Sequence, residues 1–429
     1  MNRYRQNTLP SENLFQDRRI LLWIVITAIG LRVVWALLVP TVPVSDSVAY
    51  DAFARNLAEH GIYGWTPEQP SAYWPVGTSA LYAPLFMLFG HQYWPIVALN
   101  IVLSVVIIVA AFRIARRLPQ IHSSVPLISA AVLALWPGLI MYVTVLASEL
   151  PFIASVMVAV DFWTQTKRPA FLRGVLSGIF LAAACYIRPT AQLLPLILAL
   201  SALFAGQSLR TVMVLTASAY VAMIVLIAPW TLRNYRTFDA FVVISTNAGA
   251  NLWMGNHPGS TGGYNELPES VKGMDEVSRD RVLAHEARKH IMSDIPGYLL
   301  LSGKRLVDTY DRETIPIVWN EQGIDRTLGA AAKFPLKLIA SGYWIAVLLL
   351  AIMGSWIVYA ESRKVSSLLG NPLVLLWGYF ALVHALIVSQ DRYHFPSIPS
   401  VAVLAAIALH LIYSRTAGKF SIMKKRNQN

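Results

Sequence analysis

Long apolar runs alternate with shorter polar stretches along most of this 429-residue sequence. An apolar helix of about 20 residues is long enough to cross the hydrocarbon core of a bilayer. On this criterion the sequence predicts ten membrane spans, of which the fourth, fifth and sixth are short. The predicted spans are 20–39, 94–112, 125–143, 150–162, 172–187, 191–204, 211–228, 336–359, 373–388 and 395–413. The predicted fold class is therefore an all-α polytopic membrane protein.

Residues 41–93, the first outer loop, are too long to be a simple turn between two spans. A helical pattern runs from Ser47 to His60, and Gly61 is a plausible stop signal. Residues 77–89 are apolar but too short to span, which favours a helix at the membrane interface. The loop is also rich in aromatic residues, as expected for a segment at the bilayer surface.

A second polar region covers residues 231–335. It begins with a β-like run at 241–245 and continues with amphipathic helices at 275–292 and 296–310. Together these features divide the sequence into five segments. They are a cytoplasmic N-terminus (1–19), a transmembrane core that contains the first outer loop (20–230), a periplasmic loop segment (231–335), C-terminal transmembrane helices (336–415) and a cytoplasmic tail (416–429).

Composition supports the membrane prediction. The sequence is 56% hydrophobic and only 14% charged, which leaves too little polar surface to cover a water-soluble protein of this size. The net charge of +12 would indicate nucleic-acid binding in a soluble protein. Here the Lys and Arg residues gather at one set of span ends, which is the positive-inside pattern. This pattern places both termini in the cytoplasm and excludes nucleic acid as a partner.

Two further features limit the chemistry and topology. The single cysteine, Cys185, lies in an apolar run, so an intramolecular disulfide is excluded and a packing role is expected. The first apolar run is too long for the core of a cleavable signal peptide, which predicts a signal anchor. Arg32 lies within this run, and the cost of a cation in lipid means that it either pairs structurally or contacts a phosphate.

Charged residues from five distant parts of the sequence fall at predicted outer ends of spans. Arginine suits a phosphate because its planar fork binds two oxygens and stays charged. A carboxylate suits removal of a proton from a hydroxyl or amine nucleophile. The set therefore indicates a reaction on an anionic lipid, whereas the plainer alternative is contact with headgroups and water. Its members are Asp46, Glu149, Arg188, Arg233 and Arg392.

The histidines and the nucleotide-binding motifs give weaker information about function. His285, Glu286 and His290 miss the spacing that places two zinc-binding histidines on one helix face. His384 lies within a predicted span, where a hydrogen-bonded packing role is expected, and His394 follows Arg392 closely. The sequence has no P-loop, no dinucleotide-binding glycine motif and no DxD motif, which argues against a soluble nucleotide donor.

An ordered series of short motifs resembles the bacterial GT-C membrane glycosyltransferases, which include relatives of the protein O-mannosyltransferases and the lipid A aminoarabinose transferase. The motifs run in the family's order from the first span to the last, but they do not specify a substrate. They are SDSVAYDAFARNLAEHG (45–61), YWPVGTSALYAP (73–84), ASELPF (147–152), YIRPTA (186–191), PWTLRNYRTF (229–238), STNAGANLWMGNHPGSTG (245–262) and DRYHFPSIP (391–399).

The resemblance implies a GT-C-type bundle of about ten transmembrane helices with interfacial helices on its outer face. It also implies inverting transfer of a sugar from a polyprenyl-phosphate donor to a glycolipid, polysaccharide or protein of the cell envelope. The reaction would take place on the periplasmic side of the bacterial inner membrane. No cofactor is expected, although a metal-assisted variant stays open. Two alternatives also stay open: a flippase for lipid-linked sugars, and an O-antigen-type polymerase or ligase.

Residue roles follow from the same resemblance. Asp46 matches the catalytic carboxylate of the first outer loop, and the donor phosphate is expected at Arg188, Arg233 or Arg392. Further contacts with the substrates are expected from five other residues. They are Tyr50, Trp74, Glu149, Tyr393 and His394.

Overall fold

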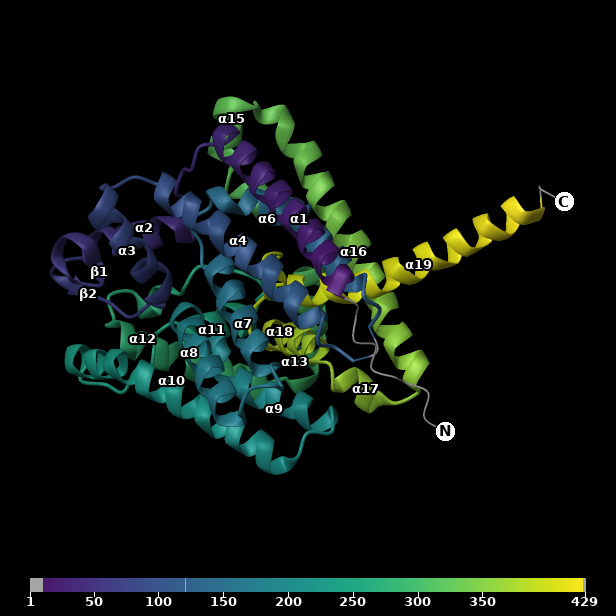
Figure 1. Ribbon diagram of the computed structural model, residues 1–429. Coiled ribbons are helices and arrows are strands. Elements are labelled where there is room, and N and C mark those ends of the chain that lie inside the picture. Colours follow the sequence, from purple (N-terminus) through teal and green to yellow (C-terminus); the bar gives the residue numbers. More distant parts are fainter. Residues whose placement is uncertain (1–10, 120, 427–429) are drawn as a thin grey trace.

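Helices make up nearly all of the regular structure (Figure 1). The structure is a computed structural model that describes residues 11–119 and 121–426. The first half of the chain forms α1 (Ser11–Leu38), α2 (Asp46–His60), α3 (Gly77–Phe89), α4 (Trp94–Ala115), α5 (Val125–Ala134), α6 (Pro137–Met141), η1 (Tyr142–Thr144), α7 (Glu149–Trp163), α8 (Ala170–Ile187), η2 (Pro189–Leu193), α9 (Leu194–Phe204) and α10 (Leu209–Phe238).

The second half continues the helical pattern. Its elements are α11 (Ala248–Asn256), η3 (Glu269–Val271), α12 (Glu276–Ser293), α13 (Ile295–Tyr310), α14 (Ile315–Val318), α15 (Glu321–Thr327), η4 (Ala330–Ala332), α16 (Lys333–Ser362), α17 (Val365–Leu369), α18 (Pro372–Leu386), η5 (Phe395–Ser397) and α19 (Ile398–Arg426). Within the described residues the only strands are β1 (Gly64–Thr66) and β2 (Gln69–Pro70), which form an antiparallel hairpin in the first outer loop. The all-α fold class is therefore confirmed.

Six helices of the described chain are long and apolar enough to cross a membrane. They match six of the predicted spans, at Gln16–Leu38, Trp94–Ala115, Ala170–Ile187, Leu209–Phe238, Ala330–Ser362 and Phe395–Arg415. The other predicted spans at 150–162, 191–204 and 373–388 correspond to the shorter helices α7, α9 and α18. The protein is a multi-pass membrane protein, but the predicted number of ten spans is not confirmed.

The predicted span 125–143 is a broken helix. Its two halves, Val125–Ala134 and Pro137–Thr144, meet at an angle of 50°, because Pro137 has no N–H to continue the hydrogen-bond ladder. The carbonyls of Leu133 and Ala134, freed by the break, accept hydrogen bonds from Arg32 at 3.3 and 3.1 Å. The guanidinium of Arg32 is fully buried. Of the two alternatives for this residue, the structure shows pairing with the backbone.

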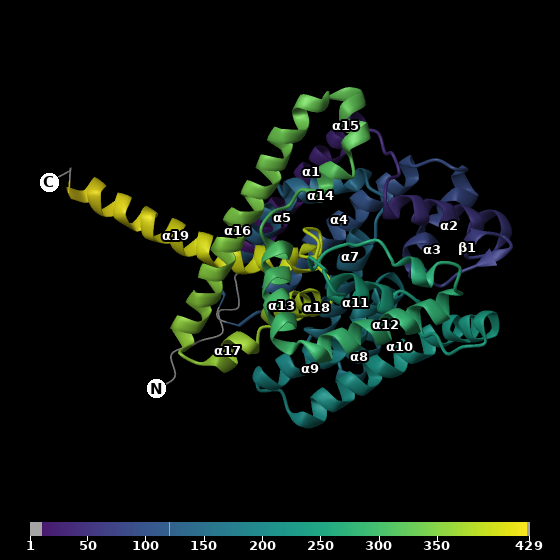
Figure 2. The same cartoon turned by 180° about the vertical axis from the view of Figure 1, so that it is seen from behind.

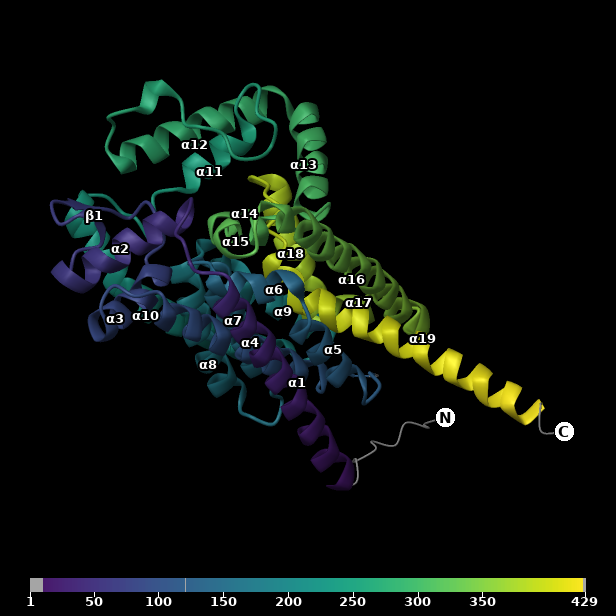
Figure 3. The same ribbon diagram turned by 90° about the horizontal axis from the view of Figure 1, so that it is seen from above.

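The helices form a bundle with an added layer of extramembrane structure. Figure 3 shows α11, α12 and α13 as a layer on one side of the bundle, whereas α19 extends away at another end. The hairpin, α2 and α3 lie together at the end far from the tip of α19, in both the front and rear views (Figures 1 and 2). The helices predicted at 47–60, 77–89, 275–292 and 296–310 are all present as α2, α3, α12 and α13.

The predicted β-like run at 241–245 is wrong, because the structure forms no strand there. Side chains of α10 take the hydrogen-bond acceptors that a neighbouring strand would use. Trp230 donates to Ile244 O at 2.9 Å, Thr231 to Val243 O at 2.9 Å, and Asn234 to Val242 O at 3.1 Å. The segment is therefore tied to a helix end and not to a sheet.

Close packing of α8 against α10 depends on two glycines four residues apart, Gly174 and Gly178. A Cβ placed at Gly178 would lie 2.4 Å from the carbonyl oxygen of Ala219. Small residues at this spacing let helix backbones approach each other in membranes. Since Arg188 directly follows the last residue of α8, this packing also fixes the position of that side chain.

We expect Gly178→Ala to destabilise the purified protein by about 1–3 kcal/mol, because the added methyl group overpacks the helix contact. The measurement is the melting temperature in detergent. Gly342→Ala is the matched control, since no atom lies within 4 Å of its Cβ position and alanine there favours the helix. Equal melting temperatures for the two variants would contradict this account of the contact.

Candidate active site

A chain of buried ion pairs joins four charged residues from separate parts of the sequence. Arg392 donates from Nη2 to Asp46 Oδ2 at 2.6 Å and from Nη1 to Glu149 Oε1 at 3.3 Å. Arg188 donates to the same oxygen of Glu149 and also to Ser148 Oγ, at 2.9 and 3.0 Å. We call Asp46, Arg392, Glu149 and Arg188 the charged cluster.

Helix ends bring the charged cluster together. Asp46 and Glu149 are the first residues of α2 and α7, where the helix dipole favours a negative charge. Arg188 follows the last residue of α8, and the next residue, Pro189, cannot continue that helix. The backbone of Ser45, directly before Asp46, has φ = 51°, a conformation that residues with a side chain rarely adopt. Strain of this kind gathers at functional sites.

Exposure differs within the cluster. The side chains of Asp46 and Arg188 are 17% and 14% exposed, whereas Arg392 is 7% exposed and Glu149 is fully buried. Burial alone would lower the pKa of Arg392, but the negative charges of Asp46 and Glu149 outweigh it and raise that pKa well above its usual value. The cluster thus combines two guanidinium groups with one carboxylate, that of Asp46, which is partly exposed to solvent.

Aromatic rings line the cluster. Tyr50 lies one helical turn after Asp46 and meets Trp74 edge to face, with ring centroids 5.8 Å apart. The Arg392 guanidinium lies 4.3 Å from the ring centroid of Trp319 and 5.5 Å from that of Tyr393. Burial, and after it the charge of Asp46, raises the pKa of Tyr50, so its hydroxyl stays protonated. Three of the predicted substrate contacts, Tyr50, Trp74 and Tyr393, therefore lie at or beside the cluster.

Arg233 does not contact the charged cluster. Its guanidinium donates to the carbonyls of Ser71 at 3.0 Å and Tyr63 at 3.2 Å, and lies 4.8 Å from the ring centroid of Trp230. These contacts hold the first outer loop against the C-terminal end of α10. The structure separates Arg233 from Arg188 and Arg392, with which the sequence grouped it.

His394 likewise belongs to another buried network. Its Nε2 lies 3.0 Å from Glu313 Oε2, and its ring stacks on Trp344 with centroids 4.0 Å apart. Glu313 also accepts from Trp136 Nε1 at 3.0 Å. His394 and Glu313 are fully buried. Successive side chains around the turn into η5 point in different directions, which separates His394 from Arg392 although they are close in sequence.

The segment that carries Arg392 is held on both sides. Ser389 N donates to Gly262 O at 2.9 Å, and the carboxylate of Asp391 accepts from Thr314 N at 2.9 Å. The fully buried Arg305 of α13 joins the end of α18 to α11, because it donates to Ala385 O and Gly255 O, both at 2.6 Å. Arg392 is therefore fixed by α11, α13 and the loop before α14, and not by its own neighbours alone.

The sequence did not single out several residues that support the cluster. Ser148 lies inside the ASELPF motif, so the motif contained its signal, and Gln390, two residues before Arg392, accepts from Arg392 Nε at 2.7 Å. Trp319, whose ring lies beside Arg392, is in a polar segment without a recognisable motif, and no sequence signal identifies it. Among the described residues, no group of three or more His, Cys, Asp or Glu side chains is arranged to hold a metal ion.

Comparisons with known proteins give matches only at the level of structure. No protein-family model and no curated protein matches the sequence. The archaeal oligosaccharyltransferase AglB from Archaeoglobus fulgidus, solved with an inhibitory peptide and dolichol-phosphate, aligns with 97% of this chain at a TM-score of 0.59 and 10% identity. ArnT from Cupriavidus metallidurans, in the apo state, aligns with 92% at a TM-score of 0.55 and 16% identity. This chain has the GT-C fold.

The GT-C assignment confirms the fold expected from the ordered motifs. The alignment covers 52% of the AglB chain and 61% of the ArnT chain, so this chain spans between half and two thirds of the length of either neighbour. At these identities the likeness describes the fold. The chemistry has to be argued from the charged cluster itself.

Proposed function

We propose that this GT-C chain is an inverting glycosyltransferase that moves a sugar from a polyprenyl-phosphate donor to a cell-envelope acceptor. The reaction is placed on the periplasmic side of the bacterial inner membrane, where the acceptor is a glycolipid, a polysaccharide or a protein. AglB binds dolichol-phosphate in its structure, which is a lipid phosphate of the same class as the proposed donor.

The observation that carries this proposal is a continuous set of ion pairs. Asp46 pairs with Arg392, Arg392 pairs with Glu149, and Glu149 pairs with Arg188. A phosphate ester needs fixed positive charge where its leaving oxygen becomes negative, and such preorganised charge is usually the largest catalytic contribution. A nucleophile needs a base within hydrogen-bond reach. The cluster contains both kinds of group. Of its two more exposed members, Asp46 is a potential base and Arg188 carries positive charge.

The proposed step balances as follows. The acceptor oxygen or nitrogen attacks the anomeric carbon from the face opposite the phosphate, and its proton passes to Asp46. The bond between the anomeric carbon and the phosphate oxygen breaks, and the electron pair leaves with the polyprenyl phosphate. Arg188 and Arg392 hold that phosphate, while Glu149 keeps both guanidinium groups oriented. Protonation of Asp46 removes one negative charge from the cluster as the phosphate gains one.

Other side chains have supporting roles in this proposal. Tyr50 and Trp74 stack on or hydrogen-bond to the sugar, and Tyr393 lies 5.5 and 6.0 Å from the two cluster guanidinium groups. Arg233 is assigned to holding the first outer loop, because its donors are used by loop carbonyls. The two guanidinium groups supply the positive charge that a divalent metal would otherwise provide, so the proposed reaction needs no metal cofactor.

The test is a purified-protein assay with a panel of polyprenyl-phosphate sugars and envelope fractions as acceptors. We expect transfer from at least one donor, inversion at the anomeric carbon, and the same rate after treatment with EDTA. If EDTA abolishes activity and added metal restores it, the proposal that the reaction needs no metal cofactor is wrong. No transfer from any donor would overturn the proposal.

Mass spectrometry of glycolipids from a deletion strain separates this function from transport. Loss of a single sugar from a mature glycan supports transfer. Accumulation of intact lipid-linked intermediates in the cytoplasmic leaflet would instead support a flippase. Accumulation of single repeat units would support a polymerase or ligase.

A further inference from the structure

Helix α13 has an apolar side that no other part of the described chain covers. At 3.6 residues per turn, Ile295, Leu299 and Leu306 fall within about 40° of one another around the helix. These residues are 49%, 61% and 42% exposed, and Leu300 and Val307 beside them are 80% and 62% exposed. We call these five residues the apolar side of α13. An exposed apolar patch of this kind marks an interaction surface.

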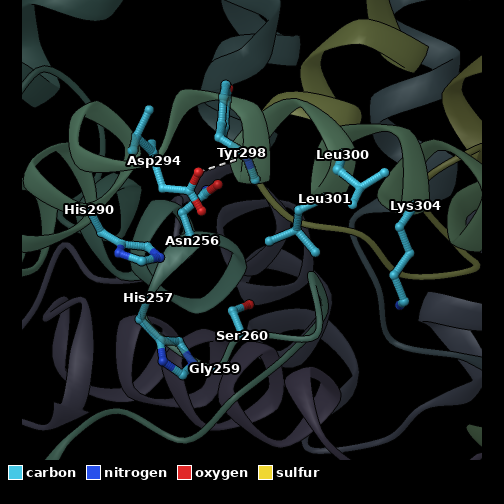
Figure 4. Close-up of a pocket in the computed structure, with 12 residues that line it drawn as sticks. Asn256, His257, Gly259, Ser260, His290, Asp294, Tyr298, Leu300, Leu301 and Lys304 are labelled. Atoms are coloured by element: carbon cyan, nitrogen blue, oxygen red, sulfur yellow. Dashed lines mark hydrogen bonds between the residues drawn. The ribbon is translucent and has the colours of Figure 1, made fainter.

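The rest of the α13 circumference is used in two other ways. Arg305 and Thr309 are fully or almost fully buried against the bundle. Lys304 pairs with Asp308 at 2.6 Å, and Figure 4 shows Lys304 extending from the other side of the helix from Tyr298. A protein-facing side, a charged side and a separate apolar side make α13 an amphipathic helix of the kind that lies in a membrane surface.

The contacts of α13 place it at the level of the bilayer. Tyr298 Oη donates to Leu386 O at 3.2 Å, and Arg305 Nε donates to Ala385 O at 2.6 Å, so α13 sits on the end of α18. Helix α18 has 15 residues and contains no Asp, Glu, Lys or Arg. Such a helix is about 22 Å long, less than the hydrocarbon core of about 30 Å. Even when it starts at the opposite surface it ends within the bilayer, and α13 lies at that depth.

The surface of α18 next to α13 is itself open to lipid. Leu382 precedes Leu386 by one helical turn, on the same face of α18, and is 57% exposed. Gly378, one turn further, has no described atom within 4 Å of its Cβ position. At its other end α13 contacts a membrane-spanning helix, because Trp344 Nε1, well inside α16, donates to Tyr310 O at 2.9 Å. The apolar side of α13 therefore adjoins the lipid-facing surface of the bundle.

Helix α12, in the same layer, has a different surface. Its exposed apolar residue, Met292, lies at the corner next to α13 and is 74% exposed. The other exposed residues before this corner are polar or charged, as expected for a helix in water. They are Ser278, Arg281, His285, Glu286, Arg288 and Lys289.

We infer that the apolar side of α13 is a membrane-binding surface that inserts among the lipid chains next to α18. The partner is the bilayer, because the apolar side continues the lipid-facing surface of α18 at the same depth. Lipid contact also explains why α13 differs from α12 although both belong to one layer. The inference does not depend on the proposed transfer reaction.

The test is spin-label EPR on the full-length protein in liposomes of phosphatidylcholine and phosphatidylglycerol. The single cysteine, Cys185, is fully buried, so Cys185→Ala gives a background without reactive thiols. Nitroxide labels are attached in Leu299→Cys and Leu306→Cys, and their collisions with oxygen, which concentrates in lipid, and with a water-soluble nickel chelate are measured. We expect an oxygen-to-nickel accessibility ratio several-fold higher than that of a label in His285→Cys on α12.

Two further labels calibrate the result. Leu349→Cys lies within α16, where Leu349 is 62% exposed, and reports the ratio in lipid. Lys304→Cys lies on the charged side of α13 and should give a lower ratio than Leu299→Cys. An unchanged melting temperature shows that each labelled variant is folded.

Two outcomes would overturn the inference. If the labels at Leu299 and Leu306 give the same ratio as the label at His285, the apolar side of α13 faces water. If both reagents are excluded from these two positions, a protein surface, such as a second copy of the chain, covers them in place of lipid.

Discussion

Asp46→Asn is expected to lower sugar transfer by about 10²–10⁴-fold, the usual contribution of a general base. The amide keeps the shape of the carboxylate, and its oxygen can still accept the hydrogen bond that Arg392 donates at 2.6 Å. It cannot take the acceptor's proton at neutral pH. Donor affinity, measured by equilibrium binding of a polyprenyl-phosphate sugar, should change little or increase, because one negative charge near the phosphate is removed.

The matched control for this prediction is Asp51→Asn. Asp51 lies in the same helix but pairs with His91 at 2.7 Å, away from the arginines. Its variant should transfer sugar at the wild-type rate. If Asp46→Asn retains turnover within tenfold of the wild type, another group accepts the proton and the proposed mechanism is wrong.

Arg392→Gln is expected to lower transfer by about 10²–10³-fold and to weaken donor binding, since it removes one of two groups that hold the leaving phosphate. It also leaves Asp46 and Glu149 without their shared cation, and removing one partner of a buried pair typically costs about 3–5 kcal/mol. Melting temperature and donor KM are therefore measured together. Arg392→Lys keeps a positive charge but not the planar fork, so it should recover stability more fully than turnover.

Arg281→Gln is the control for Arg392. Arg281 is an exposed residue of α12, and the described residues give its side chain no ion pair, so its removal should alter neither stability nor transfer. A second comparison is Arg233→Gln, which should loosen the first outer loop with a smaller effect on donor KM than Arg392→Gln. If Arg392→Lys folds normally and transfers at the wild-type rate, the bidentate phosphate contact is not needed.

The membrane architecture could be predicted from the sequence because hydrophobicity along a helix is a local property. Spans such as 94–112 and 211–228 need only about 20 apolar residues to be identified. The broken third span was missed for the same reason, since Pro137 changes the direction of the chain without changing its hydropathy. The β-like run at 241–245 was misassigned because a short run of apolar, β-branched residues cannot show that α10 supplies its hydrogen-bond partners.

The candidate site could be predicted only in part. The sequence placed Asp46, Glu149, Arg188 and Arg392 at the ends of helices on one side, and the structure joins them directly. The sequence also placed Arg233 and His394 at the same predicted depth in the membrane. In the structure Arg233 instead binds loop carbonyls, and His394 contacts Glu313. A shared depth in the membrane limits one coordinate of a residue and leaves its position around the bundle undetermined.

By itself, the sequence determined that this chain is helical, crosses the membrane several times and carries its unusual charges at helix ends. Those properties depend on residue type and spacing within single segments. Only the tertiary structure decided which charges touch, that Trp319 lies beside Arg392, and that Arg305 joins α11, α13 and α18. The physical reason is that each of these contacts links residues far apart in sequence, and helix packing, not local pattern, sets the distance between them.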